Sequence, residues 1–172
     1  MKRILLMCAA ALAFLSCEKT PEPKKESPVL GEEFEEFESL IDLSQQNKYD
    51  ETLLCKTWVL EKGISELYVD GHLESTTDIT EQVSLKSFTY NDDHTMSFFV
   101  DDYPSVDGKW LYAHNFVMIK YGAIGQIVYE VTDLTDNTLH LRSENVLLAE
   151  KLPFFRNPAG RHTLNTLVLK AE

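Results

Sequence analysis

The chain has 172 residues, with 28 acidic residues against 16 basic ones and a formal net charge of −12. That length suits one globular domain. The acidity argues against a nucleic-acid-binding protein, which needs clustered Lys and Arg to displace counterions from phosphates. Hydrophobic residues make up 44% of the chain and include nine Phe, seven Tyr and two Trp, enough to build a packed core.

The first 17 residues have the pattern of a bacterial lipoprotein signal peptide. Two basic residues precede the apolar run 4–15, which is too short to cross a bilayer. The run ends in Phe-Leu-Ser-Cys at residues 14–17, which resembles the lipobox of bacterial lipoproteins. In that family the cysteine is acylated, with palmitate for example, and the bond before it is cut. The resemblance implies a signal peptide over 1–16 and a membrane anchor on Cys17, and an ordinary signal peptide cleaved nearby is the alternative.

The three cysteines then have three different fates. The resemblance implies that Cys8 is removed with the signal peptide, that Cys17 is blocked by lipid and that Cys55 is left alone. No intrachain disulfide is expected, so stability must come from packing. Residues 1–16 contain two basic residues and no acid, and their removal changes the formal net charge from −12 to −14.

The segment before residue 50 divides into a tether and a predicted helix. Residues 17–30 contain three prolines and six charged residues, a composition that predicts a flexible tether. In residues 31–49, Phe34, Phe37 and Ile41 fall on one helical face and acids cover the opposite face. This amphipathic helix either packs on its own domain with a solvated acidic face, or serves as a docking helix or a lid.

From residue 50 the hydrophobic period changes from 3.6 to 2, which predicts eight strands separated by turns rich in Asp, Asn and Gly. The predicted strands are 57–69, 83–90, 95–101, 109–112, 116–121, 126–132, 138–146 and 162–170. Short links make neighbouring strands antiparallel, and closure of an up-and-down meander removes exposed edges. We therefore predict an all-β domain over residues 50–172, an eight-stranded antiparallel up-and-down barrel preceded by a short acidic helix.

Short motifs within this domain resemble those of lipocalin-like domains. Leu54-Cys-Lys-Thr-Trp58 resembles their Leu-x-Gly-x-Trp opening, and Asp107-Gly-Lys-Trp110 looks like their internal Gly-x-Trp strand. The hairpins 88–98 and 129–141 look like hairpins of the same domains. With the lipobox, the chain is similar to lipocalin-like lipoproteins of the Bacteroidetes type. The resemblance implies a calycin-type barrel, small apolar ligands and an outer-membrane location, with the periplasmic and cell-surface sides both open.

Motifs for catalysis and metal binding do not occur in the sequence: there is no nucleophile elbow, zinc-binding helix, phosphate loop or Cys-x-x-Cys pair. Cys55 is expected to be a small buried residue at the barrel floor rather than an activated thiol. Asp101, Asp102 and Asp107 are expected to be solvated turn acids rather than a calcium site. Glu130 either faces water or faces the interior beside a cation. We predict neither an enzyme nor a bound cofactor or metal.

The apolar faces of the predicted strands either line a pocket or fill a closed core. The candidate ligand-binding residues of the interior are Trp58, Phe98, Trp110, Tyr112 and Tyr129. The first functional hypothesis is non-catalytic binding of a small apolar or amphipathic ligand. The alternative is a protein-interaction or structural module of an outer-membrane assembly, which uses the acidic helix or the link 151–160 with Phe154 and Phe155.

Overall fold

The computed structural model describes residues 30–101, 103–123, 125–144 and 160–172. The predicted signal peptide 1–16, the lipidation of Cys17, nearly all of the tether and both Phe154 and Phe155 lie outside the described residues. The strands are β1 (Thr57–Val69), β2 (His72–Asp78), β3 (Leu85–Tyr90), β4 (Thr95–Val100), β5 (Val106–Ala113), β6 (Phe116–Tyr121), β7 (Gly125–Leu134), β8 (Thr138–Ser143) and β9 (Arg161–Ala171). Three short 3₁₀ helices accompany them: η1 (Glu35–Phe37), η2 (Glu51–Leu53) and η3 (Thr80–Gln82). Within the described ranges, no helix has the length and apolarity that crossing a membrane requires.

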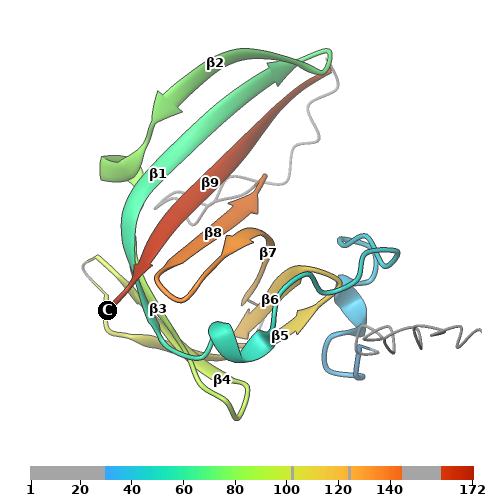
Figure 1. Ribbon diagram of the computed structural model, residues 1–172, viewed down its shortest axis with the longest axis vertical. Coiled ribbons are helices and arrows are strands. Elements are labelled where there is room, and N and C mark those ends of the chain that lie inside the picture. The colour runs from blue at the N-terminus through green and yellow to red at the C-terminus, as the bar shows by residue number, and fades with distance from the viewer. Residues whose placement is uncertain (1–29, 102, 124, 145–159) are drawn as a thin grey trace, which may run out of the picture.

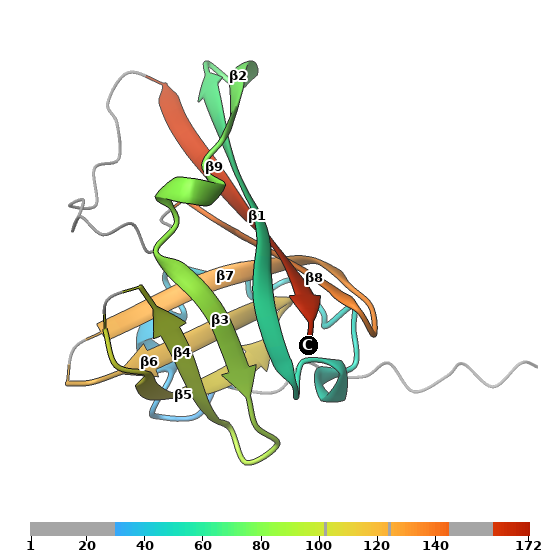
Figure 2. The same ribbon diagram turned by 90° about the vertical axis from the view of Figure 1, so that its left-hand side faces the viewer.

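Eight of the strands form a closed antiparallel barrel, which confirms the all-β prediction (Figures 1 and 2). The order around the ring is β1-β3-β4-β5-β6-β7-β8-β9, and β9 pairs with β1 to close it. Each neighbouring pair is joined by main-chain hydrogen bonds, so the ring itself has no free edge. The alternating apolar residues of the strands therefore share one enclosed interior.

The ninth strand, β2, was not predicted, and it lies outside the ring. β1 pairs with β3 only over Thr57–Val59 and with β2 over Ile64–Val69, while β9 follows β1 along its length. The second half of β1, the first half of β9 and β2 thus form a three-stranded extension beyond the barrel (Figure 1). All seven residues of β2 are exposed.

Gly63 lies where β1 leaves the ring. Its carbonyl accepts a hydrogen bond from the Ile79 main chain, and its own N–H donates to the Thr80 hydroxyl at 3.0 Å. A Cβ at this position would be 2.9 Å from the Val83 side chain. A residue without a side chain therefore allows η3 to cross close to β1 and lead the chain from β2 back into the barrel.

The two ends of the barrel are defined by their connections. We call the end closed by residues 50–56 and by the β3–β4, β5–β6 and β7–β8 turns the floor. The rim is the opposite end, where β4 and β6 finish and β5 and β7 begin. The extension continues from the rim, as Figures 1 and 2 show.

The structure does not show the helix expected over residues 31–49. In this segment the N–H of residue i+3 donates to the carbonyl of residue i, as Phe37 does to Phe34 at 3.0 Å. Within the segment, only η1 has helical geometry. A 3₁₀ turn has three residues per turn, so Phe34 and Phe37 still share one side. We call residues 30–49 the strap.

The strap packs on the outer wall of the barrel. Leu30, Phe34 and Phe37 form a second apolar cluster with Ala113 and Met118, and Phe37 is fully buried. The acids of the strap are engaged as well, since Glu33 pairs with Lys109 at 3.0 Å and Glu36 pairs with Lys120 at 2.9 Å. Of the two alternatives for this segment, packing on its own domain is the one observed, with part of the acidic face paired rather than solvated.

Candidate ligand-binding site

The floor is closed by a short plug that begins at η2. The Asp50 side chain caps this helix by accepting a hydrogen bond from the Thr52 main chain at 3.1 Å. The chain then turns Leu54 and Trp58 into the interior, where both are fully buried. The Trp58 indole N–H donates to the Leu54 carbonyl at 2.9 Å, so its polar atom is satisfied within the plug.

Two further candidate residues also direct their polar atoms at the floor. The Trp110 indole N–H donates to the Asn91 carbonyl at 3.0 Å, in the β3–β4 turn. The Tyr112 hydroxyl donates to the Asn115 side-chain oxygen at 3.0 Å, in the β5–β6 turn. Trp58, Trp110 and Tyr112 are thus held by floor hydrogen bonds. Phe98, which has no polar side-chain atom, and Tyr129 are the two predicted candidates without such a bond.

The middle of the barrel is occupied by an aromatic cluster centred on Phe88. Its ring centroid lies 5.6 Å from that of Tyr90, 5.9 Å from that of Tyr129 and 6.2 Å from that of Phe98. Phe98 in turn meets Tyr121 edge to face at 5.1 Å. These rings come from β3, β4, β6 and β7, so the cluster joins strands around half of the ring.

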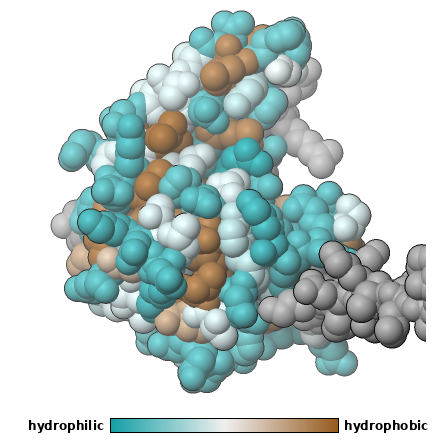
Figure 3. Space-filling model, in the orientation of Figure 1, coloured by the Kyte–Doolittle hydropathy of each residue, from teal (hydrophilic) through white to brown (hydrophobic). Residues whose placement is uncertain are grey.

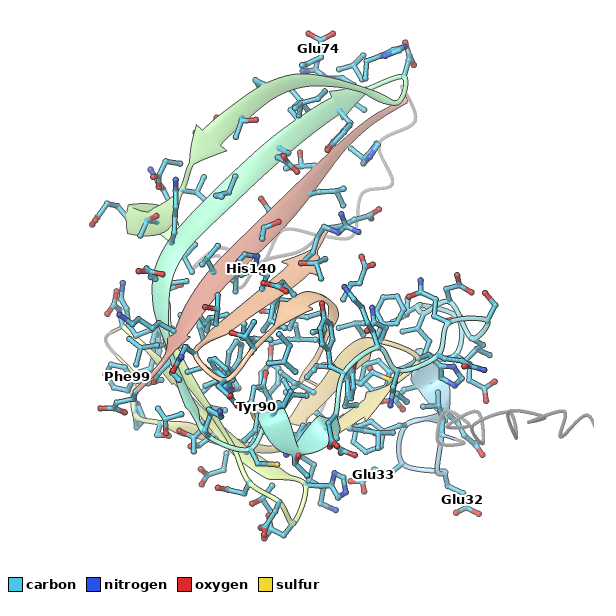
Figure 4. All side chains as sticks on the ribbon, viewed as in Figure 1. Glu32, Glu33, Glu74, Tyr90, Phe99 and His140 are labelled. Carbon is cyan, nitrogen blue, oxygen red and sulfur yellow. The ribbon has the colours of Figure 1, made fainter. Side chains whose placement is uncertain are left out.

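The hydroxyls of Tyr90 and Tyr129 lie in this cluster without hydrogen-bond partners among the described residues. Figure 4 labels Tyr90 inside the ring of strands, whereas Phe99 and Glu74 lie outside it. A buried hydroxyl without a partner costs about 1–3 kcal/mol. Burial raises the pKa of both phenols, so both stay protonated and able to donate near neutral pH.

Both ends of the barrel contain fully and partly buried side chains: Leu53 and Cys55 at the floor are partly buried, and Leu85 at the rim is fully buried. At the rim the inward-facing side chains of Val100, Val106, Tyr121 and Ile127 are only partly buried, although they pack on the core. The Tyr121 ring covers Gly125 of the neighbouring strand, a position where any Cβ would clash with the ring. The rim is therefore an apolar surface that leads inward to Phe98 and Tyr129.

Charged side chains lie mainly outside the barrel, although one carboxylate oxygen of Glu51, beside the floor plug, is buried without a hydrogen-bond partner among the described residues. Within the described ranges, Asn165 is the one buried residue in the polar or charged class, and its amide donates to the Glu144 carbonyl at 3.3 Å. Glu130 faces the outer wall, where it forms an ion pair with Arg142 of the neighbouring strand at 2.6 Å. The interior thus combines apolar side chains with phenols.

Three titratable groups meet beside the floor plug. Glu51 lies 3.5 Å from the His94 imidazole, and burial raises the pKa of its carboxyl. Cys55 is half-buried in the same place, and burial, followed by the nearby Glu51, raises the pKa of its thiol. A raised pKa disfavours the nucleophilic thiolate, which agrees with a packing role.

The outer surface is mostly polar on the face that Figure 3 shows, where hydrophobic areas interrupt a mainly hydrophilic surface. Two surface depressions, of about 330 and 390 Å³, lie on the outer wall beside Lys120, Gly122 and Ala123. No cluster of metal-ligating side chains occurs in the described part of the chain.

Sequence reasoning missed Phe88, Tyr90 and Tyr121 as interior residues. The available signal was the alternation in β3, where Leu85, Phe88 and Tyr90 are buried, although a register irregularity between Leu85 and Ser87 interrupts the strict period of two. In β6 the alternation is hidden because Val117, Met118 and Ile119 are all buried. Met118 is buried from outside, by the strap.

The chain matches no protein-family model, no curated protein and no solved structure at a significant level. The assignment of a function therefore depends on the sequence motifs and on the geometry of the barrel.

Proposed function

We propose that this protein is a membrane-anchored lipoprotein whose lipocalin-like barrel binds a small apolar or amphipathic ligand without catalysis. The observation that carries the proposal is the difference between the two ends of the barrel. At the floor, Trp58, Trp110 and Tyr112 are fixed by hydrogen bonds to the plug and the turns. At the rim, apolar Val100, Val106 and Ile127 and the ring of Tyr121 are partly buried beside fully buried Leu85. Eight strands give an interior just wide enough for one small ligand.

The anchor is the second part of the proposal. Acylation of Cys17 at more than one position would hold the protein stably, because each buried CH₂ contributes about 0.8 kcal/mol and one chain alone binds only marginally. Cys17→Ser is expected to abolish incorporation of an alkyne-labelled fatty acid and to release the protein from membranes. Cys55→Ser is the matched control and should keep both the fatty-acid label and the association with membranes. Labelling that persists in Cys17→Ser would contradict the anchor.

The ligand is tested by native mass spectrometry of protein released from membranes of its own host. The wild type is expected to carry a bound small molecule. Val106→Trp, which enlarges an inward-facing rim residue, should lose it, and Phe99→Trp, a neighbouring position that is 47% exposed on the outer wall, should retain it. Ligand binding would be refuted if repeated preparations of the wild type carried no bound small molecule and the purified protein bound no added apolar probe.

Protein interaction is the second candidate function, and β2 is the observation that favours it. Among the described residues this strand pairs with β1 alone, so its other edge offers main-chain groups to a partner strand. Thr76→Lys places a strongly hydrated cation on that edge and should weaken capture of a co-purifying partner. Unchanged capture by Thr76→Lys would count against β2 as the contact.

A further inference from the structure

Tyr90 and Tyr129 carry the only side-chain oxygens in the barrel core that the described residues leave without a partner. Native proteins satisfy the great majority of buried polar groups, and an unsatisfied one implies a water, an ion or a ligand. Both residues are at least 99% buried, so bulk solvent does not supply the acceptor. The two hydroxyls therefore require a hydrogen-bond acceptor that no described residue supplies.

The two hydroxyls belong to one site. Both rings pack against Phe88, at 5.6 and 5.9 Å between centroids, and Tyr129 is close enough to contribute to the raised pKa of Tyr90. Phe98 and Tyr121 lie between this pair and the rim, because Phe98 contacts both Phe88 and Tyr121. A ligand that entered from the rim would pass apolar side chains first and reach the hydroxyls last.

The charge distribution limits what such a ligand carries. The described part of the core contains no charged side chain, and a buried ion without a counter-charge is strongly disfavoured. Building on the proposed function, we infer that the ligand is a neutral molecule with a carbonyl or ether oxygen that accepts hydrogen bonds from Tyr90 and Tyr129. Its apolar remainder packs on Phe98 and extends toward the rim. Free fatty acids and amines are poor ligands of this site.

Three probes of similar shape test the inference on the full chain. Acetophenone is a neutral ketone, ethylbenzene replaces its carbonyl with CH₂, and benzoate replaces its acetyl group with a carboxylate. Dissociation constants are measured by ligand-observed NMR, and the carbonyl stretching frequency of bound acetophenone is measured by infrared spectroscopy. The ketone is expected to bind about tenfold more tightly than ethylbenzene, with its stretch shifted to lower frequency by hydrogen bonding. Benzoate is expected not to bind at neutral pH.

The double variant Tyr90→Phe/Tyr129→Phe removes both donors and keeps both rings. It should bind ketone and hydrocarbon with equal affinity and return the carbonyl stretch to its value in an apolar solvent. Tyr112→Phe is the matched control, because its hydroxyl is committed to Asn115 at the floor. This control should keep the preference for the ketone and the shifted stretch.

The outcomes separate the inference from the proposed function. If ethylbenzene binds as tightly as acetophenone to the wild type, or if benzoate binds as tightly as the ketone, the inference is wrong while ligand binding stands. A ketone preference that survives in the double variant overturns the role of the two tyrosines. If none of the probes binds and the natively purified protein is bare, both the inference and the ligand-binding proposal fail.

Discussion

The floor of the barrel and the aromatic cluster around Phe88 are built from similar side chains but use their polar atoms differently. At the floor, the indoles of Trp58 and Trp110 and the hydroxyl of Tyr112 each bond to a nearby turn. In that cluster, Tyr90 and Tyr129 make no such bond within the described residues, although Tyr90 directly precedes the β3–β4 turn at the floor. Aromatic content alone therefore does not identify a binding site. The hydrogen-bonding state of each ring separates residues that are fixed to the turns from residues whose hydroxyls have no partner among the described residues.

The largest expected effect is at the floor. Trp58→Ala should lower the free energy of unfolding by about 4 kcal/mol, because it leaves a cavity at a fully buried site and removes the bond to Leu54. Ile127→Ala, at the partly buried rim, should cost about 1 kcal/mol. Urea denaturation of the two variants measures the difference. Equal losses would show that the rim is packed as tightly as the floor.

The strap provides the next largest effect, because it leads directly into the floor. Phe37→Ala should cost about 3 kcal/mol, since it empties the apolar contact with Ala113 and Met118. Hydrogen exchange should then increase in residues 31–49 and in the β5–β6 turn, where His114 contacts the Gln45 carbonyl at 2.9 Å. Leu40→Ala, at an exposed position of the same segment, is the control and should change little. Exchange that stays unchanged at the turn would mean that the floor is independent of the strap.

A smaller effect distinguishes the two classes of tyrosine. Tyr112→Phe should destabilise the free protein by about 1 kcal/mol, because it leaves the Asn115 side chain without its hydroxyl partner. Tyr129→Phe should leave the stability unchanged or raise it, because it deletes a hydroxyl that has no partner. Thermal and urea unfolding of ligand-free protein measure both. A loss in Tyr129→Phe as large as in Tyr112→Phe would place Tyr129 with the floor residues.

The smallest effect concerns pH at the floor. Burial raises the pKa of Glu51 above its ordinary value of 4.5, so the folded state binds this proton more tightly than the unfolded chain. Its contribution to stability is therefore present below that ordinary value and is lost as the pH rises through the folded pKa. Glu51→Gln should gain stability relative to the wild type between pH of about 4 and about 7. Asp92→Asn, at another acid near Cys55, is the control. If the difference in unfolding free energy between Glu51→Gln and the wild type stays constant across this pH range, the assignment is wrong.

The strands of the ring were predictable because their side chains alternate between interior and outer wall. The predicted bounds of β1 and β6 agree with the structure, and those of β9 differ by one residue at each end. β2 was missed because all of its residues are exposed, so the sequence His-Leu-Glu-Ser-Thr-Thr-Asp has no buried face to create a hydrophobic period. A strand with both faces exposed has no alternation of apolar and polar residues from which it could be predicted.

The site was less predictable than the ring. That Trp58, Phe98, Trp110, Tyr112 and Tyr129 lie in the interior follows from the alternation, and the structure places them there. Which of them keep a free hydrogen-bonding group depends on turns distant in sequence, such as the Asn91 carbonyl that receives Trp110. The strap shows the same limitation, since the apolar spacing of Phe34 and Phe37 suits an α-helix and a 3₁₀ turn equally.

The pairing of β1 with β9 also has a consequence for the order in which the barrel forms. Trp58 lies opposite Ala171, so the ring closes only when the start and the end of the domain meet. Contacts of such long sequence separation form slowly, because the entropy of loop closure is lost before the contact is gained. A chain still lacking its last residues cannot complete the ring. Closure of the ring is therefore the last pairing that the growing chain can make, because it requires the C-terminal strand.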